Sequence, residues 1–149
     1  AITRKGEGYI FTGPSGSGKS TIGGLSPENR LLSDELAAVV ARDGAYIVCG
    51  NPFWGNFQKG VRNGSAPVRH LFFLRKARRN RIDPLPVSEK MKRILGNVLF
   101  FGRHIRLTEE LLAACVDFMK RTPADELHFR PDDSVWRCIE DAGQKSSAR

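Results

Sequence analysis

Two kinds of hydrophobic pattern alternate along the chain. Short apolar runs that stop at glycine or at acidic residues predict buried strands, whereas longer segments with apolar residues three and four positions apart predict amphipathic helices. The expected strands lie at residues 8–13, 31–33, 36–41, 45–49, 68–74 and 126–129. Because strands and helices are interleaved, the pattern predicts an α/β fold with a mixed sheet flanked by helices.

Turn and loop signals separate these runs. Asp43-Gly44 lies between two of the expected strands, and this dipeptide is a strong signal for a β-hairpin. Residues 50–67 are dense in Gly, Asn, Pro and Ser, which predicts a loop.

A short helix is expected to begin near Lys19 and to end before Pro27, and three more are expected in the second half of the chain. We expect Ser88, Thr108 and Asp133 to cap these three, because such side chains accept backbone hydrogen bonds at helix N-termini. The expected apolar faces are Met91, Ile94, Leu95, Val98 and Leu99 on the first of the three, and Leu111, Leu112, Cys115, Val116 and Met119 on the second. Glu109 and Glu110 would then lie in the first turn of the second helix, and Lys120 and Arg121 in its last.

Length and composition narrow the class of protein. The 149 residues suit a single domain, and we expect the polar segment 143–149 to fray. Apolar runs such as residues 71–74 are far shorter than the roughly 20 residues of a membrane helix. The three cysteines are odd in number and widely spaced, which argues against a disulfide framework or a zinc site. No secretion signal opens the sequence, so we expect a cytoplasmic protein.

The net charge of +8 is concentrated in one part of the chain. Residues 51–82 contain no acidic residue. They carry eight cations, which account for the whole excess: Lys59, Arg62, Arg69, Arg75, Lys76, Arg78, Arg79 and Arg81. Such a block suggests an anionic partner, with a solvated loop as the alternative. Residues 75–81 lack interleaved aromatic side chains, so the pattern does not favour nucleic acid.

The sequence Gly13-Pro14-Ser15-Gly16-Ser17-Gly18-Lys19-Ser20-Thr21 contains a complete P-loop motif between an expected strand and an expected helix. Its glycines allow backbone N–H groups to wrap around a phosphate. The Lys19 ammonium is expected to reach the β- and γ-phosphates, and the Ser20 hydroxyl is expected to bind Mg²⁺. The motif therefore predicts binding of ATP with Mg²⁺.

Two further elements are candidates for the chemistry. Asp34 and Glu35 follow the apolar run 31–33, and carboxylates at a strand end can bind Mg²⁺ or accept the proton of an attacking hydroxyl. Arg69 precedes another expected strand. It is a candidate to stabilise transferring charge, with a salt bridge at the strand edge as an equal alternative.

Taken together, the motifs resemble those of the HPr kinase and phosphoenolpyruvate carboxykinase superfamily, in particular its small HPr-kinase-like members, which include lasso-peptide-precursor kinases. The resemblance extends from about Gly8 to Ile139. It is carried by residues 12–21, Leu32-Ser33-Asp34-Glu35, Gly50-Asn51-Pro52-Phe53-Trp54-Gly55, Ser65-Ala66-Pro67-Val68-Arg69 and Leu71-Phe72-Phe73-Leu74.

This resemblance implies transfer of the γ-phosphoryl group of ATP to a serine of a protein or peptide. It makes Asp34 the expected general base and Glu35 its neighbour on the metal side. The sequence departs from the family pattern in three places: the second acidic residue is Glu35, Asn56 stands where Glu is common, and no histidine precedes His70. A nucleotide-binding module with impaired catalysis, and a small-molecule kinase or carboxykinase-like enzyme, therefore stay open as alternatives. The acceptor's identity and a homo-oligomeric state also stay open.

Overall fold

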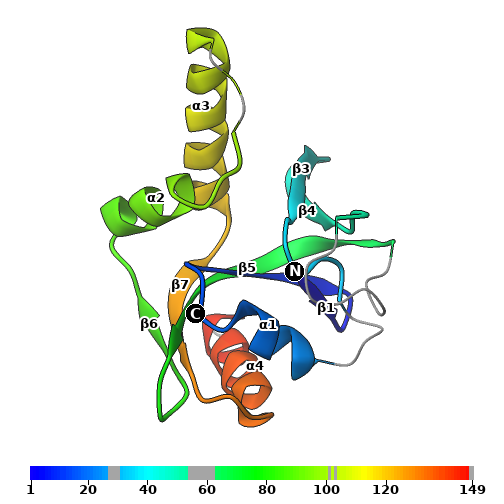
Figure 1. Ribbon diagram of the computed structural model, residues 1–149, viewed down its shortest axis with the longest axis vertical. Helices are drawn as coiled ribbons and strands as arrows, with labels where there is room; N and C mark the ends of the chain where they lie inside the picture. Colours follow the sequence, from blue (N-terminus) through cyan, green and yellow to red (C-terminus); the bar gives the residue numbers. More distant parts are fainter. Residues whose placement is uncertain (27–30, 54–62, 101, 103, 148–149) are drawn as a thin grey trace.

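The structure is a computed structural model that describes residues 1–26, 31–53, 63–100, 102 and 104–147 (Figure 1). Its centre is a mixed sheet of seven strands in the order β1-β2-β5-β4-β3, with β7 paired to β5 and β6 paired to β7. The strands are β1 (Ile2–Arg4), β2 (Glu7–Thr12), β3 (Ala38–Arg42), β4 (Ala45–Cys49), β5 (Ser65–Lys76), β6 (Arg81–Pro84) and β7 (Ala124–Phe129). The pairs β2–β5 and β5–β7 are parallel, and the other pairs are antiparallel.

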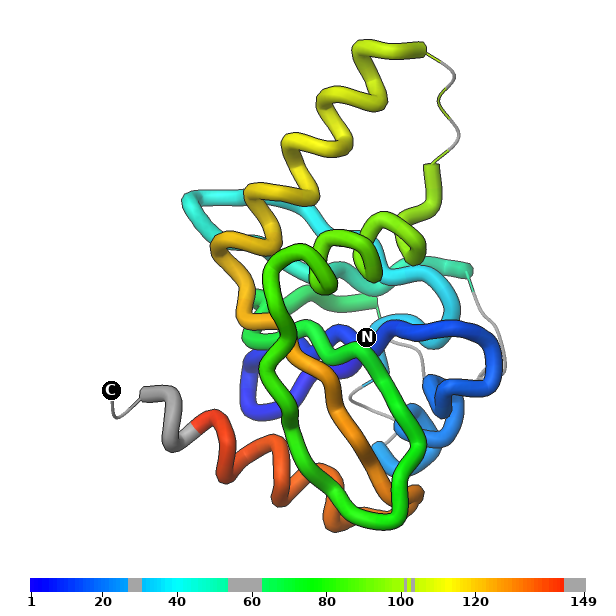
Figure 2. The backbone as a smooth tube through the Cα atoms, turned by 90° about the vertical axis from the view of Figure 1, so that its left-hand side faces the viewer, coloured from blue at the N-terminus to red at the C-terminus, as the bar shows by residue number. Residues whose placement is uncertain are grey.

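Helices cover the sheet on two sides. Figure 2 shows α1 (Lys19–Gly24) and α4 (Ser134–Ser147) on one side of the strands, and α2 (Val87–Leu95) and α3 (Ile105–Arg121) on the other. Each side has its own apolar core. Phe72, Leu127 and Phe129 pack with α1 and α4, and Leu71 and Phe73 pack with α2 and α3. This alternation follows from the strand period of two residues, which points successive side chains of β5 to opposite faces.

Several local predictions are confirmed. β2, the following loop and α1 lie where the sequence places them, and β3 and β4 form the expected hairpin. Asp43 and Gly44 have φ values of 48° and 78°, as the tight two-residue turn requires. The mixed α/β sheet flanked by helices is also confirmed.

Other local predictions are wrong. Residues 31–33 form no strand, because Leu31 makes only an isolated bridge to Ile2. β5 begins at Ser65, inside the expected loop. α4 extends past Gly143 to Ser147, where we expected fraying.

The expected helix caps are also displaced. Pro86 precedes α2, so Ser88 lies within the helix. His104 caps α3 by accepting a hydrogen bond from Arg106 N–H, which places Glu109 and Glu110 beyond the first turn. Just before α4, Asp132 Oδ1 accepts hydrogen bonds from the N–H and the hydroxyl of Ser134, whereas the Asp133 side chain makes no hydrogen bond with any described residue.

The α2–α3 unit projects from the sheet, as Figures 1 and 2 show. Of the expected apolar positions, Ile94 and Cys115 are buried, whereas Leu99 and Leu112 are exposed. In the described part of the chain, no helix is both long and apolar enough to cross a membrane.

Candidate functional site

A glycine-rich loop, residues 13–18, joins the end of β2 to α1. A hydrogen bond from Ser17 N–H to the Pro14 carbonyl closes it, at 3.1 Å. Lys19 then folds back over the loop, and its Nζ donates to the carbonyls of Gly13 and Pro14 at 2.7 and 3.1 Å. The ammonium group is thus held against the loop backbone by two hydrogen bonds.

Gly18 is the position in this loop where a side chain is least tolerated. Its φ is 108°, and an added Cβ would lie 2.4 Å from Cζ of Phe129, a core residue at the end of β7. The same Cβ position is 3.6 Å from Cε of Lys76, so the end of β5 lies beside the start of α1. The loop is therefore fixed by direct packing on the ends of two strands.

We predict that Gly18→Ala destabilises the fold by about 2–4 kcal/mol, because overpacking against Phe129 adds to the strain of a left-handed backbone. Gly16→Ala is the matched control: φ is 79° there, but an added Cβ meets nothing within 4 Å. The control should lose only about 1 kcal/mol. Urea unfolding measures both, and equal losses would show that Gly18 does not pack as described.

Ser17 is an unsatisfied polar group within the loop. Its Oγ is buried and makes no hydrogen bond with any described residue. An added Cβ at Gly13 would lie 2.8 Å from this oxygen, so the hydroxyl faces Gly13. A buried hydroxyl without a partner is costly, which makes it available to a ligand that enters the loop.

A tight turn carries the acidic pair. The Leu36 carbonyl accepts hydrogen bonds from Ser33 Oγ and from Asn51 Nδ2. Ser33 is only 1% exposed, and its N–H donates to the Ala1 carbonyl at 3.2 Å. These bonds fix the backbone on both sides of Asp34 and Glu35. The role of Asn51 in holding this turn has no local signal in the sequence.

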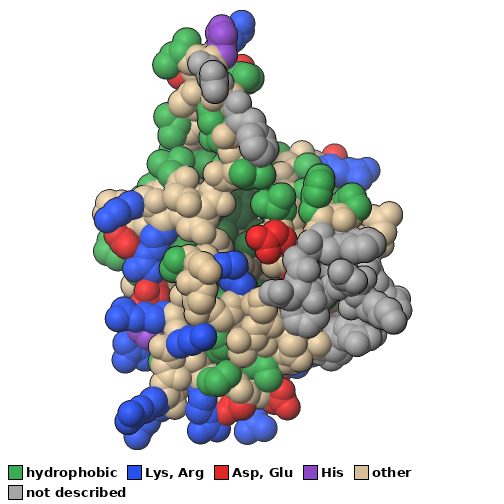
Figure 3. Space-filling model, viewed as in Figure 1, with side chains coloured by type: hydrophobic (Ala, Val, Ile, Leu, Met, Phe, Trp, Pro, Cys, Tyr) green, Lys and Arg blue, Asp and Glu red, His purple; other side chains and the backbone are tan. Residues whose placement is uncertain are grey.

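The loop and the turn meet at a cavity of about 580 Å³. Gly13 and Lys19 line it from the loop, and Glu35 lines it from the turn. The rest of the lining is mainly apolar and comes from β2, β5, the β3–β4 hairpin, α2, α3 and the segment after α2. Figure 3 shows the hollow on this face of the molecule, with apolar side chains around it and acidic and basic side chains beside it.

Asp34 is not among the described residues that line this cavity, whereas Glu35 is. The Glu35 side chain makes no hydrogen bond or ion pair with any described residue. Its carboxylate is therefore available to a ligand. The structure therefore places Glu35 at the cavity, whereas the family resemblance made Asp34 the expected base.

One wall of the cavity is held by Arg93 of α2. Its guanidinium lies 2.6 Å from Oε1 of Glu89 and 2.6 Å from Oε1 of Glu126 on β7. It also lies over the Phe73 ring, 5.7 Å from the centroid. Burial opposes ionisation of Glu126, but the hydrogen bonds and positive charges of Arg93 and His128 together outweigh it and hold the pKa of this carboxyl below its usual value.

The opposite wall is held by Tyr46 of β4. Its ring packs edge-on against Phe118 of α3, with centroids 4.8 Å apart, and its hydroxyl donates to Asp117 Oδ2 at 2.6 Å. That hydrogen bond raises the pKa of Tyr46. Burial raises the pKa of the Cys115 thiol, which stays neutral and serves as part of the apolar lining. The hairpin and α3 are therefore fixed relative to each other.

Arg69 is not brought to the site. It lies in β5 near Glu7, with 3.7 Å between Nε and Oε1. In the parallel register Thr12 pairs with Phe73, so Arg69 lies four residues back along β5, about 13 Å from the loop end. The salt bridge at the strand edge, which the sequence left open, is the alternative found.

The basic block is also less uniform than its sequence suggests. Besides Arg69, the described cations Arg75 and Arg81 pair with Glu126 and Asp83, at 3.8 and 2.9 Å. Lys76, Arg78 and Arg79 are exposed and pair with no described carboxylate. Lys59 and Arg62, together with Trp54 and Asn56, lie outside the described residues.

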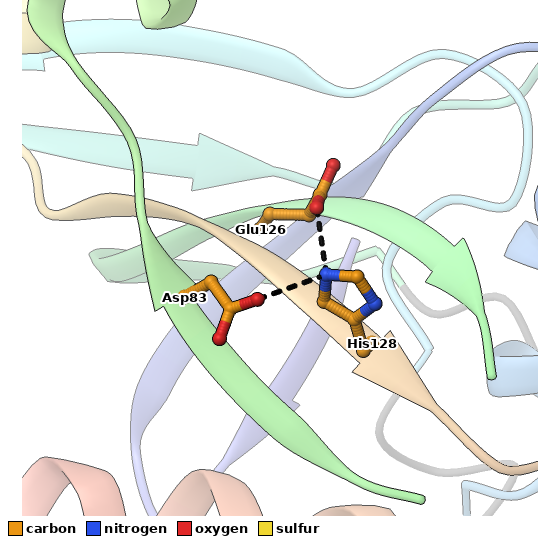
Figure 4. A group of neighbouring side chains, drawn as sticks. All are labelled: Asp83, Glu126 and His128. Carbon is orange, nitrogen blue, oxygen red and sulfur yellow. Dashed lines mark ion pairs between the residues drawn. The ribbon is translucent and has the colours of Figure 1, made fainter. Parts of the chain in front are cut away.

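A cluster of three titratable side chains, which sequence spacing did not reveal, lies on β6 and β7 (Figure 4). Ligand-type atoms of Asp83, Glu126 and His128 lie within 4.8 Å of one another, and His128 Nε2 is 2.7 Å from Glu126 Oε2. Both carboxylates also contact guanidinium groups, Glu126 that of Arg93 and Asp83 that of Arg81. Because protein cations already neutralise them, we interpret the group as an ion-pair network and not as a metal centre.

Comparisons of this chain with family models, with curated proteins and with solved structures found no match.

Proposed function

We propose that this chain is a P-loop kinase that binds ATP with Mg²⁺ and transfers the γ-phosphoryl group to a serine hydroxyl of a protein or peptide, as the resemblance to HPr kinases implies. The observation that carries the proposal is that Lys19 and Glu35 line one cavity. A fixed cation for the phosphates and an available carboxylate for the acceptor hydroxyl are the two groups that such a transfer needs.

The residues of the glycine-rich loop and of the neighbouring turn fit a nucleoside triphosphate. The glycine-rich loop offers backbone N–H groups, the unsatisfied Ser17 hydroxyl and the Lys19 ammonium, all suited to phosphate oxygens. Ser20 and Asp34 offer a hydroxyl and a carboxylate, whose oxygens are the ligands that Mg²⁺ prefers. When bound, Mg²⁺ supplies neutralisation of the charge on the β- and γ-phosphate oxygens.

The transfer is a single displacement at phosphorus. The serine Oγ of the acceptor forms a bond to the γ-phosphorus as the bond from that atom to the β,γ-bridging oxygen breaks, and ADP leaves with the bonding pair. Glu35 accepts the proton of the serine hydroxyl, and Lys19 stabilises the negative charge on the phosphates.

Transfer of label from γ-labelled ATP to a serine peptide tests this proposal. The wild-type chain should label the peptide on serine, and Lys19→Ala should not. Nucleotide binding without any transfer would favour the module with impaired catalysis. Transfer to a metabolite in place of serine would favour the small-molecule kinase or carboxykinase-like alternative.

The unpaired cations Arg78 and Arg79 are expected to attract an acidic acceptor, because their field is not cancelled by described carboxylates. Reversing both to Glu should slow association with an acidic serine peptide and flatten its salt dependence, since the field is screened with a Debye length of about 8 Å at physiological ionic strength. Affinity for ATP should change little.

Stopped-flow association at low and high salt measures this effect. Arg106 and Arg137, both reversed to Glu, provide a control of equal charge change outside the block. Equal slowing by the two double variants would assign the effect to net charge alone. Loss of ATP binding in the Arg78/Arg79 variant would place the block in the nucleotide site.

A further inference from the structure

The strand β3 forms an edge of the sheet that no other strand of the described residues covers. Among the described residues it pairs only with β4, and all five of its residues are exposed. Val40 is 46% exposed, and such an apolar open edge can pair with another chain. Ala38 and Val39 of the same strand line the cavity that contains Lys19 and Glu35. The open edge and the cavity are therefore continuous.

The cavity lies at the end of the loop where the γ-phosphate is expected. Lys19, which in a P-loop reaches the β- and γ-phosphates, lines it. Ser20 and Thr21, which follow in α1, are not among the described residues lining it. A ligand in the apolar part of the cavity would therefore approach the transferring group and not the nucleoside end of ATP.

We propose that β3 and this cavity together bind the phosphoryl acceptor as an extended segment, added to the sheet as a strand, with a bulky apolar side chain two residues from the serine. This inference rests on the proposed kinase function. Side chains two residues apart in a strand point to the same side. The serine hydroxyl then faces Glu35 and Lys19, while the apolar side chain enters the part of the cavity lined by Val98, Leu99 and Phe118.

The hairpin geometry determines which backbone groups of β3 are free to pair. The two-residue turn at Asp43-Gly44 makes Arg42 and Ala45 a hydrogen-bonded pair, and such pairs alternate along an antiparallel ladder. Val40 and Ala38 are then bonded to β4, so the N–H and C=O groups of Val39 and Ala41 point to the open edge. Strand addition at such an edge is a common mode of peptide recognition.

Short synthetic serine peptides with γ-labelled ATP test the side-chain requirement. A peptide with leucine two residues from the serine should be phosphorylated with a kcat/KM about tenfold or more above that of its isomer with leucine adjacent to the serine. Leu99→Lys should remove this preference without changing ATP affinity. Leu107→Lys, an equally exposed leucine of α3 that does not line the cavity, should retain it (exposed fractions 55% and 49%).

N-methylation of single peptide residues tests strand addition directly, because a methyl group removes one backbone donor. A single methyl group should lower kcat/KM about tenfold when it lies on one set of alternate residues of the peptide. A single methyl group on a residue of the other set should have little effect. In parallel with each assay, calorimetric titration of the protein measures its binding of ATP in the presence of Mg²⁺. If ATP does not bind, the proposed function and this inference both fail.

Other results would overturn the inference while leaving the proposed function intact. These are equal rates for the two leucine isomers, or an N-methyl scan without alternation. ATP binding with no transfer to any peptide would contradict both the inference and the proposed function. Weaker ATP binding by Leu99→Lys would assign the apolar cavity to the nucleobase. Self-association of the wild-type protein in solution that Val40→Lys abolishes, with unchanged peptide kinetics, would assign the edge to a second copy of the chain.

Discussion

Lys19→Ala should lower the affinity for ATP by about a hundredfold and abolish phosphoryl transfer, because the phosphates lose their fixed cation and its charge-assisted hydrogen bonds. Calorimetric titration with ATP and Mg²⁺ measures the affinity. The variant also loses two hydrogen bonds to the loop carbonyls, so its stability should fall by about 1–3 kcal/mol, which urea unfolding detects separately.

Lys92→Ala is the control for this prediction. Lys92 is an exposed lysine of α2 that does not line the cavity, and its removal changes the net charge equally. ATP affinity should stay at the wild-type value in this control. A Lys19→Ala variant that binds ATP as tightly as the control would exclude the glycine-rich loop as the phosphate site.

Glu35→Gln should lower turnover about a hundredfold or more, the usual scale for loss of a general base, with ATP affinity nearly unchanged. The side chain keeps its size but no longer accepts the proton of the serine hydroxyl. Asp34→Asn should have the smaller effect on turnover, because Asp34 does not line the cavity in the described part of the chain.

Steady-state kinetics with saturating ATP separate the two carboxylates. The pH profile adds a second readout, because loss of the base should remove the decline in kcat at acidic pH. If Asp34→Asn reduces kcat more than Glu35→Gln, Asp34 is the base, as the family resemblance implied, and the position of Glu35 in the cavity is incidental to catalysis.

Local patterns predicted those parts of the fold that local physics determines. The turn at Asp43-Gly44 requires positive φ at both residues, and the sequence supplies residue types that tolerate it. The strand before Gly13 and the helix after Gly18 follow from an apolar run and from loop glycines in the same short segment. Each of these elements is stabilised by residues close to it in the sequence.

Some errors arose within a single turn, and others where a partner distant in sequence determines the outcome. Thr108 is a good capping residue, but α3 begins earlier, at Ile105 with His104 as its cap, and Thr108 Oγ1 donates back to the His104 carbonyl within the helix. The segment 51–82 has no acidic residue of its own. The sheet nevertheless brings Glu7 to Arg69 and Glu126 to Arg75. Charge counted along the chain therefore overstated the free charge in space.

The candidate site likewise combines parts that are determined locally with parts that depend on segments distant in sequence. The glycine-rich loop and its lysine could be predicted from eight consecutive residues, because the motif is local. The cavity could not, because the loop, the turn at Glu35, the β3–β4 hairpin and α2–α3 are all needed to enclose it. Sequence alone could not show that Glu35, and not Asp34, is the described residue that lines the cavity, since adjacent residues differ only in which way the folded turn directs them.

A crystal structure of the protein with Mg²⁺ and a non-hydrolysable ATP analogue would test the central claim most directly. We expect the β- and γ-phosphates to lie in the glycine-rich loop, with Lys19 Nζ moved from the Gly13 and Pro14 carbonyls onto phosphate oxygens. The γ-phosphate should face the cavity that Glu35 lines. Triphosphate bound elsewhere, or a γ-phosphate directed away from that cavity, would contradict the account.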